Sequence, residues 1–342
     1  RIYGLISPIL ILSSLIFFLF FTKKINIKKI SFIFLVLIST FIFSLILKPY
    51  LWENPITNFY NSIKYLGEFG NIWKQQSLFL GQIIYAKDVP WFYSPLWIII
   101  TTPIFYIALF FIGILFYFFN FLKNFKINFT KKKFYFDSIF LSIIIIPLTG
   151  SIILSESSFN SWRHLYFIYP YIIIFSLLAL KKLTKIFNKL IFLRIIYSIT
   201  ILTLLYNFFW IFKNHPHQYV YFNFLAGKNL NEKFDLDYFA LSYKENLEYI
   251  LNNDKREKIY ITNNSLNKPV YFLNSLHKNK RERFIFEFTD RDPDYIITNY
   301  FLDKIKKNKK ISDEKIKNEY EIFKQIIIDN NVINTVFKKK SK

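Results

Sequence analysis

The chain has 342 residues, of which 53% are apolar, and it carries 43 Phe, 24 Tyr and 6 Trp and a net charge of +22. This hydrophobicity excludes a disordered chain. The absence of cysteine excludes a disulfide-stabilised secreted domain, cysteine-ligated zinc and cysteine-based catalysis. The apolar residues collect in stretches of about twenty residues, the length that crosses the hydrocarbon layer of a bilayer. We therefore expect a polytopic α-helical membrane protein.

Six windows are rich in Ile, Leu and Phe and almost free of charge, which predicts a membrane-spanning helix in each. They are 2–22, 30–47, 96–119, 136–155, 164–180 and 190–212. The chain begins inside the first window and contains no methionine, so we also expect further native sequence before residue 1.

The connections between these windows differ in charge. Loops 23–29, 120–135 and 181–189 contain several lysines and no acidic residue, whereas loop 48–95 and turn 156–163 are mixed. The positive-inside rule makes the lysine loops cytoplasmic. Lysines beside spans act as orientation signals and lipid contacts, and no nucleic-acid-binding motif accompanies them. The charge therefore favours membrane lipids over nucleic acid as partners.

The last part of the chain, 214–342, is more polar and predicts a small α/β domain outside the membrane, following a transmembrane region at 1–213. Its elements are an amphipathic helix at 242–251, strands at 258–262, 283–288 and 294–299, a lysine-rich helix at 301–318, and strands at 320–328 and 332–337 around a turn at 329–331.

Loop 48–95 is longer than a plain connection, which is typical of functional loops. Residues 56–66 show helical spacing that suits a helix in the membrane interface. The loop also carries Glu53, Lys87 and Asp88, and it returns to the membrane through an aromatic segment with Trp91 and Tyr93. Two interpretations stay open for these aromatic residues: an anchor belt at the interface, or one wall of a cleft for a sugar or lipid headgroup.

A second polar feature lies at the outer end of the fifth span, where Arg163 and His164 stand between aromatic residues. An arginine there can bind a phosphate through two parallel hydrogen bonds, or it can snorkel to the interface. His164 can carry a proton or donate to the same phosphate, or it can be structural.

Two further patterns favour ordinary structural roles. His215 and His217 have no carboxylate at ligand spacing, which favours an interfacial elbow over a metal site, and the alternating Asp290, Asp292 and Asp294 are typical of a turn. We predict no metal centre from these residues and leave a divalent cation open as a cofactor. Asp235 and Asp237 receive no role.

Three motifs together resemble the C-terminal part of bacterial GT-C glycosyltransferases, in particular the protein mannosyltransferase-like enzymes and the lipid A aminoarabinose transferases. They are Pro90, Trp91, Tyr93 and Pro95; Trp162 to Tyr166 with Tyr169 and Pro170; and His217 to Asn223 with Leu236 to Tyr238 and Leu241 to Tyr243. The resemblance covers about 48–250.

The resemblance implies transfer of a sugar from a polyprenyl-phosphate donor to an acceptor on the outer face of the inner (plasma) membrane. It implies that Arg163 binds the donor phosphate, with His164 or Lys87 second, and that Trp91, Tyr93, Glu53 and Asp88 line the substrate cleft. The catalytic base of this family is an acidic residue in the first external loop, upstream of residue 1, so no base is named. The sugar and the acceptor stay unidentified.

Two other functions stay open: a lipid or polysaccharide transporter or flippase, and a binding module on a membrane anchor. A transporter usually needs charges within its spans and helices interrupted by glycine or proline. This chain has 7 Gly, and none of its predicted spans has an acidic residue near its middle.

Overall fold

The computed structural model describes residues 12, 13, 16, 19, 27–72, 76–86, 88–123, 132–153, 160–286, 288–305 and 310–341. The chain divides into two compact units. The first unit contains Arg1–Gln75 and Ala86–Thr203, and the second contains Gln76–Tyr85 and Leu204–Lys342. Part of the predicted external loop 48–95 therefore belongs to the second unit.

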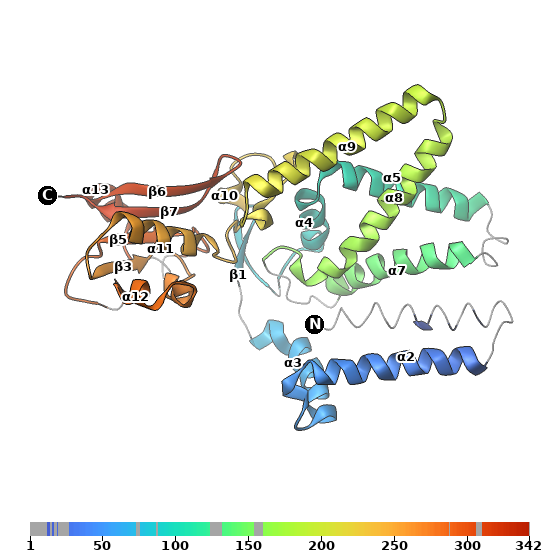
Figure 1. Cartoon of the computed structure of the whole chain (residues 1–342), viewed down its shortest axis with the longest axis horizontal. Coiled ribbons are helices and arrows are strands. Elements are labelled where there is room, and N and C mark those ends of the chain that lie inside the picture. The colour runs from blue at the N-terminus through green and yellow to red at the C-terminus, as the bar shows by residue number, and fades with distance from the viewer. Residues whose placement is uncertain are drawn as a thin grey trace. The chain divides into compact units, whose positions relative to one another are not determined.

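The first unit is helical (Figure 1). Its described elements are α2 (Ile27–Ile46), η1 (Pro49–Leu51), α3 (Pro55–Ile72), α4 (Tyr93–Thr101), α5 (Ile104–Lys123), α7 (Lys132–Ile153), η2 (Arg163–Ile168), α8 (Tyr169–Ile186) and α9 (Leu190–Lys213), which runs on into the second unit. The helix predicted at 56–66 is present within α3, which is longer at both ends.

Three described helices are long and apolar enough to cross a membrane: Ile104–Lys123, the joined η2 and α8 at Arg163–Ile186, and Leu190–Lys213. They correspond to the spans predicted at 96–119, 164–180 and 190–212. Helices α2 and α7 contain the shorter apolar stretches Ile30–Thr40 and Phe136–Ile152. The span predicted at 2–22 lies outside the described residues except for four positions.

The prediction that one continuous helix covers 96–119 is wrong, because the structure has two helices there, α4 and α5. Helix α4 ends at Thr101, and α5 begins at Ile104. Between them Thr102 is extended, with φ −105° and ψ 139°. The residue before a proline disfavours the helical conformation, and Pro103 follows Thr102. The membrane-length helix therefore starts at 104 and continues to 123.

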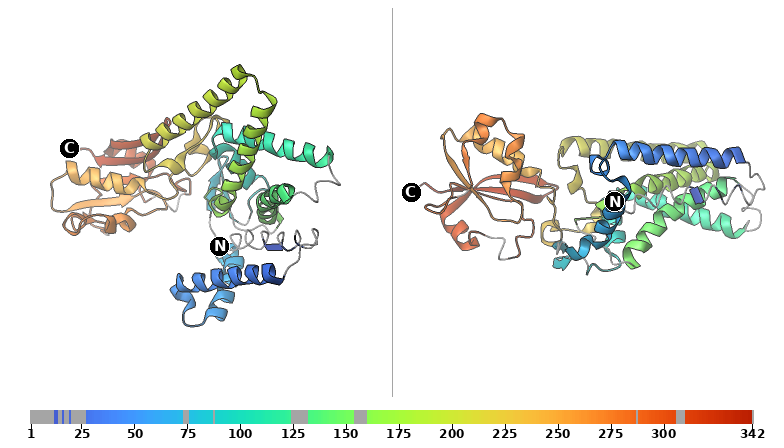
Figure 2. Two further views of the ribbon diagram at one scale, coloured as in Figure 1. Left: turned by 45° about the vertical axis from the view of Figure 1, so that its right-hand side comes forward. Right: turned by 90° about the horizontal axis from the view of Figure 1, so that it is seen from below.

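Helices α5 and α8 pack against each other (Figure 1), within the helical unit that Figure 2 shows from two further sides. They approach each other closely at Gly113. A Cβ atom at this position would lie 2.2 Å from the backbone oxygen of Phe175. Only glycine allows the two backbones to come this near. Around the contact, the Phe175 ring packs edge-on against Phe110 and Tyr117, and Tyr117 hydrogen-bonds Ser138 of α7 at 2.7 Å. The contact therefore sets the packing of α5, α7 and α8.

The second unit contains a five-stranded mixed sheet in the order β4-β3-β5-β7-β6. Its strands are β3 (Ile259–Asn263), β4 (Phe284–Ile285), β5 (Tyr295–Thr298), β6 (Tyr320–Ile328) and β7 (Asn331–Lys339). Strands β4, β3 and β5 are parallel, and β7 and β6 continue the sheet antiparallel. Its other elements are η3 (Gln218–Val220), η4 (Phe224–Ala226), α10 (Leu230–Lys233), α11 (Ser242–Asn253), η5 (Pro269–Ser275), α12 (Lys278–Arg281) and α13 (Asp313–Glu319).

Helix α11 covers one face of this sheet and forms its core. Its apolar residues Tyr243, Leu247, Ile250 and Leu251 are all buried and belong to one cluster with residues of β3, β5 and β7. The helix predicted at 242–251 is thus confirmed. So is the predicted turn between the last two strands, since Asp329 and Asn330 both have positive φ, as a two-residue hairpin turn requires.

Two predictions for this unit are wrong in extent. Among the described residues of the lysine-rich helix predicted at 301–318, only those of α13 are helical, because Tyr300 and Leu302 have positive φ and the Ser312 side chain caps a new helix at the Lys315 N–H; residues 306–309 lie outside the described residues. The strand predicted at 283–288 is reduced to the two residues of β4.

A hairpin from the loop 48–95 was not predicted. Strands β1 (Gln76–Phe79) and β2 (Gln82–Tyr85) pair antiparallel around Leu80 and Gly81, which both have positive φ. The hairpin contacts the chain before α11: Phe79 forms a bridge with Phe234, and the Gly81 N–H donates to the Lys233 carbonyl at 3.1 Å.

The α5–α8 contact makes Gly113→Ala destabilising. An alanine within a helix is normally about 0.5–1 kcal/mol more favourable than a glycine. Here the added methyl group meets a backbone carbonyl, so we expect a net loss of about 1–3 kcal/mol, the usual cost of overpacking, measured as a lower thermal transition in detergent. Ala108→Val adds carbon atoms to an exposed position of the same helix and is the control. An unchanged or higher transition for Gly113→Ala would contradict the contact.

Candidate functional site

The segment carrying Arg163 and His164 is shaped by a tight turn before α8. Asn160 and Ser161 both lie in the left-handed region, with φ 53° and 69°, a conformation that asparagine tolerates better than most residues. The Leu165 N–H then donates to the Trp162 carbonyl at 2.8 Å and starts η2. Pro170 follows in the first turn of α8, where a missing N–H costs nothing.

Trp162 joins this segment to the end of α4. Its indole Nε1 donates to the Thr101 hydroxyl at 2.9 Å, and the Thr101 hydroxyl donates to the Trp97 carbonyl at 2.6 Å. The Trp162 ring is buried and packs edge-on against Tyr166, with 4.7 Å between the centroids. Trp162 therefore joins the turn before α8 to the carboxyl end of α4, the helix that contains Tyr93 and Pro95.

Arg163 and His164 are half-buried next to this anchor. They begin the membrane-length helix Arg163–Ile186, whose other end carries Lys181, Lys182 and Lys185. Because both side chains follow a buried tryptophan in a 3-10 turn, their backbone positions are fixed by packing. The segment can present a guanidinium and an imidazole at one place.

The residues predicted to line a substrate cleft do not behave as one group. Trp91 is 68% exposed, whereas Tyr93 is 1% exposed and packs edge-on against Trp97. The Tyr93 ring is therefore covered by packing and does not form an open wall with Trp91. Glu53 and Asp88 are exposed, and neither makes a hydrogen bond or ion pair within the described ranges. Lys87 lies outside the described residues.

The two histidines after α9 point to different partners. His215 is exposed and lies 2.6 Å from the Gln218 amide. His217 is buried, and its Nε2 lies 3.2 Å from a carboxylate oxygen of Glu245, which also pairs with Lys324 at 2.8 Å. The hydrogen bond to His217, followed by that to Lys324, lowers the pKa of Glu245 to about 2. In the part of the chain with described coordinates, no group of three metal-ligating side chains occurs.

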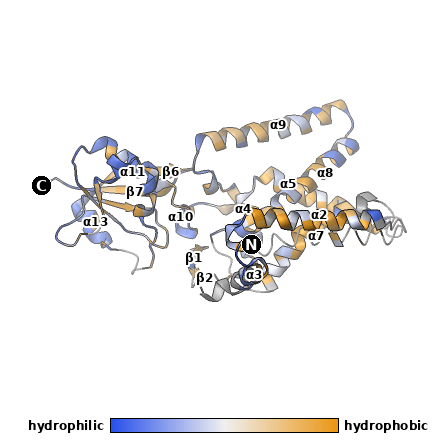
Figure 3. Cartoon of the chain, turned by 60° about the horizontal axis from the view of Figure 1, so that its bottom comes forward, coloured by the Kyte–Doolittle hydropathy of each residue, from blue (hydrophilic) through white to orange (hydrophobic). Residues whose placement is uncertain are grey.

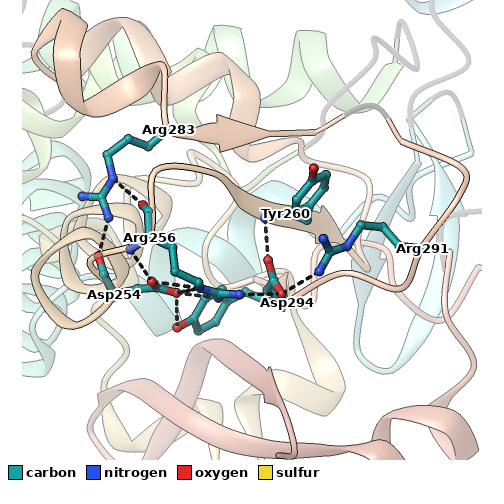
Figure 4. Close-up of polar contacts among 7 residues, drawn as sticks. Asp254, Arg256, Tyr260, Arg283, Arg291 and Asp294 are labelled. Carbon is teal, nitrogen blue, oxygen red and sulfur yellow. Dashed lines mark hydrogen bonds and ion pairs between the residues drawn. The ribbon is translucent and has the colours of Figure 1, made fainter.

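Two of the alternating aspartates before β5, Asp292 and Asp294, pair with cations of the protein, and Figure 4 shows the contacts of Asp294. Asp294 pairs with Arg256 at 2.9 Å and Arg291 at 3.3 Å, and it accepts the Tyr260 N–H at 2.9 Å. Asp292 pairs with Lys315 and Lys339, each at 2.7 Å. Hydrogen bonds from these two lysines lower the pKa of Asp292 to about 2. Both carboxylates thus fix the loop before β5.

Asp235 and Asp237, which the sequence did not assign, are buried in the second unit. Asp235 accepts the backbone N–H of Leu78 at 2.7 Å and that of Leu302 at 3.3 Å. It therefore connects the β1–β2 hairpin with the segment after β5. Burial raises the pKa of Asp235 to about 7, although these two hydrogen bonds oppose the rise.

Asp237 lies at the centre of a polar network at the carboxyl ends of the parallel strands. Its carboxylate accepts the hydroxyls of Tyr219 and Ser242, and the Asn299 amide donates to its backbone carbonyl at 2.9 Å. Burial raises the pKa of Asp237 to about 6, while the hydrogen bonds from Ser242 and Tyr219 lower it. The network continues through Asn334, which donates to Ser242 at 2.6 Å.

From the raised pKa values of Asp235 and Asp237, we predict that the second unit loses stability as the pH rises from about 5 to about 7. Their folded pKa values of about 7 and 6 exceed the unfolded value of about 3.9. In this window the folded state binds more protons than the unfolded state, so ionisation favours unfolding. Glu245 and Asp292, with pKa values of about 2, are ionised throughout. Urea unfolding of the full chain in detergent at pH 5 and 7, followed by hydrogen exchange of β5 and β7 peptides, measures the effect.

Asparagine substitutions separate the two carboxyls. Asp237→Asn removes one ionisable group and is expected to reduce the pH dependence, since its hydroxyl partners can rotate to accept from the new amide. Asp235→Asn leaves one backbone N–H without an acceptor, which costs about 1–3 kcal/mol, and is expected to lower the urea midpoint at both pH values. Equal stability of the wild type at pH 5 and 7 would contradict the assignment.

Comparison of this chain with models of known protein families, with curated proteins and with solved structures found no match. The resemblance to GT-C glycosyltransferases therefore depends on the three sequence motifs: the aromatic segment, the segment at Arg163, and His217 to Asn223 with Leu236 to Tyr238 and Leu241 to Tyr243. Function is inferred below from those motifs and from the arrangement of the residues that carry them.

Proposed function

We propose that this chain is part of a membrane glycosyltransferase that transfers a sugar from a polyprenyl-phosphate donor to an acceptor hydroxyl at the outer face of the inner (plasma) membrane. The observation that carries the proposal is the Trp162–Thr101 hydrogen bond, 2.9 Å long. It joins Trp162, from one of the segments that resemble this enzyme class, to Thr101 at the end of α4, the helix that contains Tyr93 and Pro95 of another. It thereby anchors the turn that carries Arg163 and His164 at one end of a membrane-length helix.

The proposed topology has six spans, with the lysine loops in the cytoplasm and the second unit outside the cell membrane. Three membrane-length helices support the membrane part of this arrangement. In this orientation Arg163 lies at the outer interface, because Lys181, Lys182 and Lys185 occupy the other end of the same helix. A lipid-linked donor would present its phosphate at that interface.

The proposed chemistry is a substitution at the anomeric carbon of the sugar. A base removes the proton of the acceptor hydroxyl, whose oxygen forms a bond to the anomeric carbon while the bond to the phosphate oxygen breaks. The electron pair stays on the leaving phosphate. A fixed cation at this phosphate stabilises the transition state, and Arg163 is assigned to that role, with His164 as a second donor. The base is not assigned to a residue of this chain.

A transporter is less well supported. Such proteins usually hold ionisable residues within their spans, and no acidic residue occurs in Ile104–Lys123, Arg163–Ile186 or Leu190–Lys213.

The role of Arg163 can be tested without knowing the sugar or the acceptor, because transfer from any polyprenyl-phosphate sugar releases the same product, polyprenyl phosphate. We expect Arg163→Ala to weaken polyprenyl phosphate binding by about 10- to 100-fold, the range of a hydrogen bond to a charged group. Native mass spectrometry of the complete protein in detergent measures the affinity. Arg163→Lys should recover part of the binding, since it keeps the charge without the two-pronged geometry.

The matched control is Arg194→Ala, which removes an exposed arginine from α9 and should leave the affinity within about two-fold. Thermal transitions of all variants establish that they are folded. Equal binding by the wild type and Arg163→Ala would refute the phosphate role. Transfer from labelled polyprenyl-phosphate mannose and aminoarabinose then tests activity. We expect the transfer rates of the variants to follow the same order as their affinities for polyprenyl phosphate.

The positioning role of the Trp162–Thr101 bond is tested by a double-mutant cycle. Trp162→Phe removes the indole N–H, and Thr101→Val removes the hydroxyl with little change in volume. If the bond fixes Arg163, each variant weakens polyprenyl phosphate binding, and the double variant is no weaker than the worse single variant, since both remove one interaction. Additive losses would show that the two residues act separately.

A further inference from the structure

A cavity of about 410 Å³ lies among the ends of α5 and α8 and the start of α7. Its lining includes Lys123 from the last turn of α5, Lys181, Lys182 and Lys185 from the last turns of α8, and Asp137 from α7. Because the carboxyl ends of both α5 and α8 line it, the two helices run in the same direction towards this cavity. It lies at the other end of the Arg163–Ile186 helix from the candidate site.

The cavity follows from the helix contact described above. The backbones of α5 and α8 meet at Gly113 and Phe175. The lining residues start at Gly113 on α5 and at Leu178 on α8, and all others on these two helices lie nearer the carboxyl ends. Space therefore opens between the helices beyond their closest approach. Its inner wall is partly apolar, with Phe116 and Leu178, and its rim is cationic.

Among the described residues, the lysines at this rim have no ion-pair partner. All four lysines are exposed, and within the residues that the structure describes none of them makes an ion pair or side-chain hydrogen bond. Asp137 is the acidic residue of the lining, and it has contacts of its own. Lys185 lies three and four residues after Lys182 and Lys181, a spacing at which like charges destabilise a helix. A bound anion would remove this repulsion.

The position of the lysines selects the kind of anion. They terminate two helices that are long and apolar enough to cross a membrane, and Figure 3 shows these helices coloured by hydropathy. In a bilayer, the ends of such helices leave the hydrocarbon layer and meet the lipid phosphates. The helix dipole favours a cation at a carboxyl end, but it does not require a cavity. Basic pockets between membrane helices suit phosphate-bearing headgroups.

We propose that this cavity binds the phosphate headgroup of an anionic membrane phospholipid, with the lysine ammonium groups around the phosphate and an acyl chain along the apolar wall. The site is independent of the proposed glycosyltransferase reaction, because it uses none of the residues assigned to the donor phosphate.

Phosphatidylglycerol is the probe, with phosphatidylcholine as the zwitterionic reference. The complete protein is purified in a neutral detergent, and retention of each lipid is titrated by native mass spectrometry. Lys123→Gln with Lys182→Gln removes two charges from the cavity. A lysine near a membrane surface contributes about a five-fold factor in affinity, so this double variant is expected to weaken phosphatidylglycerol binding about 30-fold. Arginine at both positions should keep the binding.

The control, Lys28→Gln with Lys189→Gln, removes the same charge from lysines that do not line the cavity, and should stay within two-fold of the wild type. Equal losses of phosphatidylglycerol affinity in both double variants would mean general attraction to anionic lipid and would overturn the proposal. Unchanged affinity in both would overturn it as well. If millimolar inorganic phosphate displaced the lipid, and if phosphate also bound tightly when no lipid was present, the site would be assigned to free phosphate instead. If the double variant does not fold, as judged by its thermal transition, Lys182→Gln against Lys189→Gln gives the same comparison.

Discussion

The first unit depends on the absence of a side chain at one position. At Gly113 the backbone of α5 lies directly against the carbonyl of Phe175 in α8, and close packing of this kind is a main source of helix association in a lipid environment, where burial of apolar surface gives no advantage. The contact orders Phe110 and Tyr117 around it. It also fixes the direction of the helix that bears Arg163 at one end and three lysines at the other. Both proposed anion sites therefore depend on the same pair of helices.

The second unit is organised by buried carboxyls. Asp235 and Asp237 lie two residues apart and are both inaccessible to solvent, which is costly unless their oxygens are hydrogen-bonded. One accepts backbone N–H groups from two distant segments, and the other accepts side-chain hydroxyls. They hold the segment before α11 against the carboxyl ends of β3 and β5. Asp254 and Asp294 both pair with Arg256 at the opposite, amino ends of β3 and β5.

Much of the second unit was predictable because its elements have strong local signals. Helix α11 has apolar residues at helical spacing, β5 is a continuous apolar stretch, and Asp329 with Asn330 is a typical hairpin turn. The role of Asp235 was not predictable, since its donors are the backbone N–H groups of Leu78 and Leu302. No local pattern encodes such distant pairs. The buried state of Tyr93 was missed for the same reason: sequence shows that a ring is at an interface, but not which side of it is covered.

The hairpin of β1 and β2 has a consequence for dissecting the protein. It is encoded between the two sequence segments of the first unit, yet its Leu78 N–H satisfies Asp235 and its Phe79 ring packs against Phe234. A recombinant fragment starting near residue 204 would therefore expose an apolar surface and leave an acidic group without one of its donors. Such a fragment needs Gln76–Tyr85 joined to it through a designed linker before its folding or ligand binding can be compared with that of the intact polypeptide.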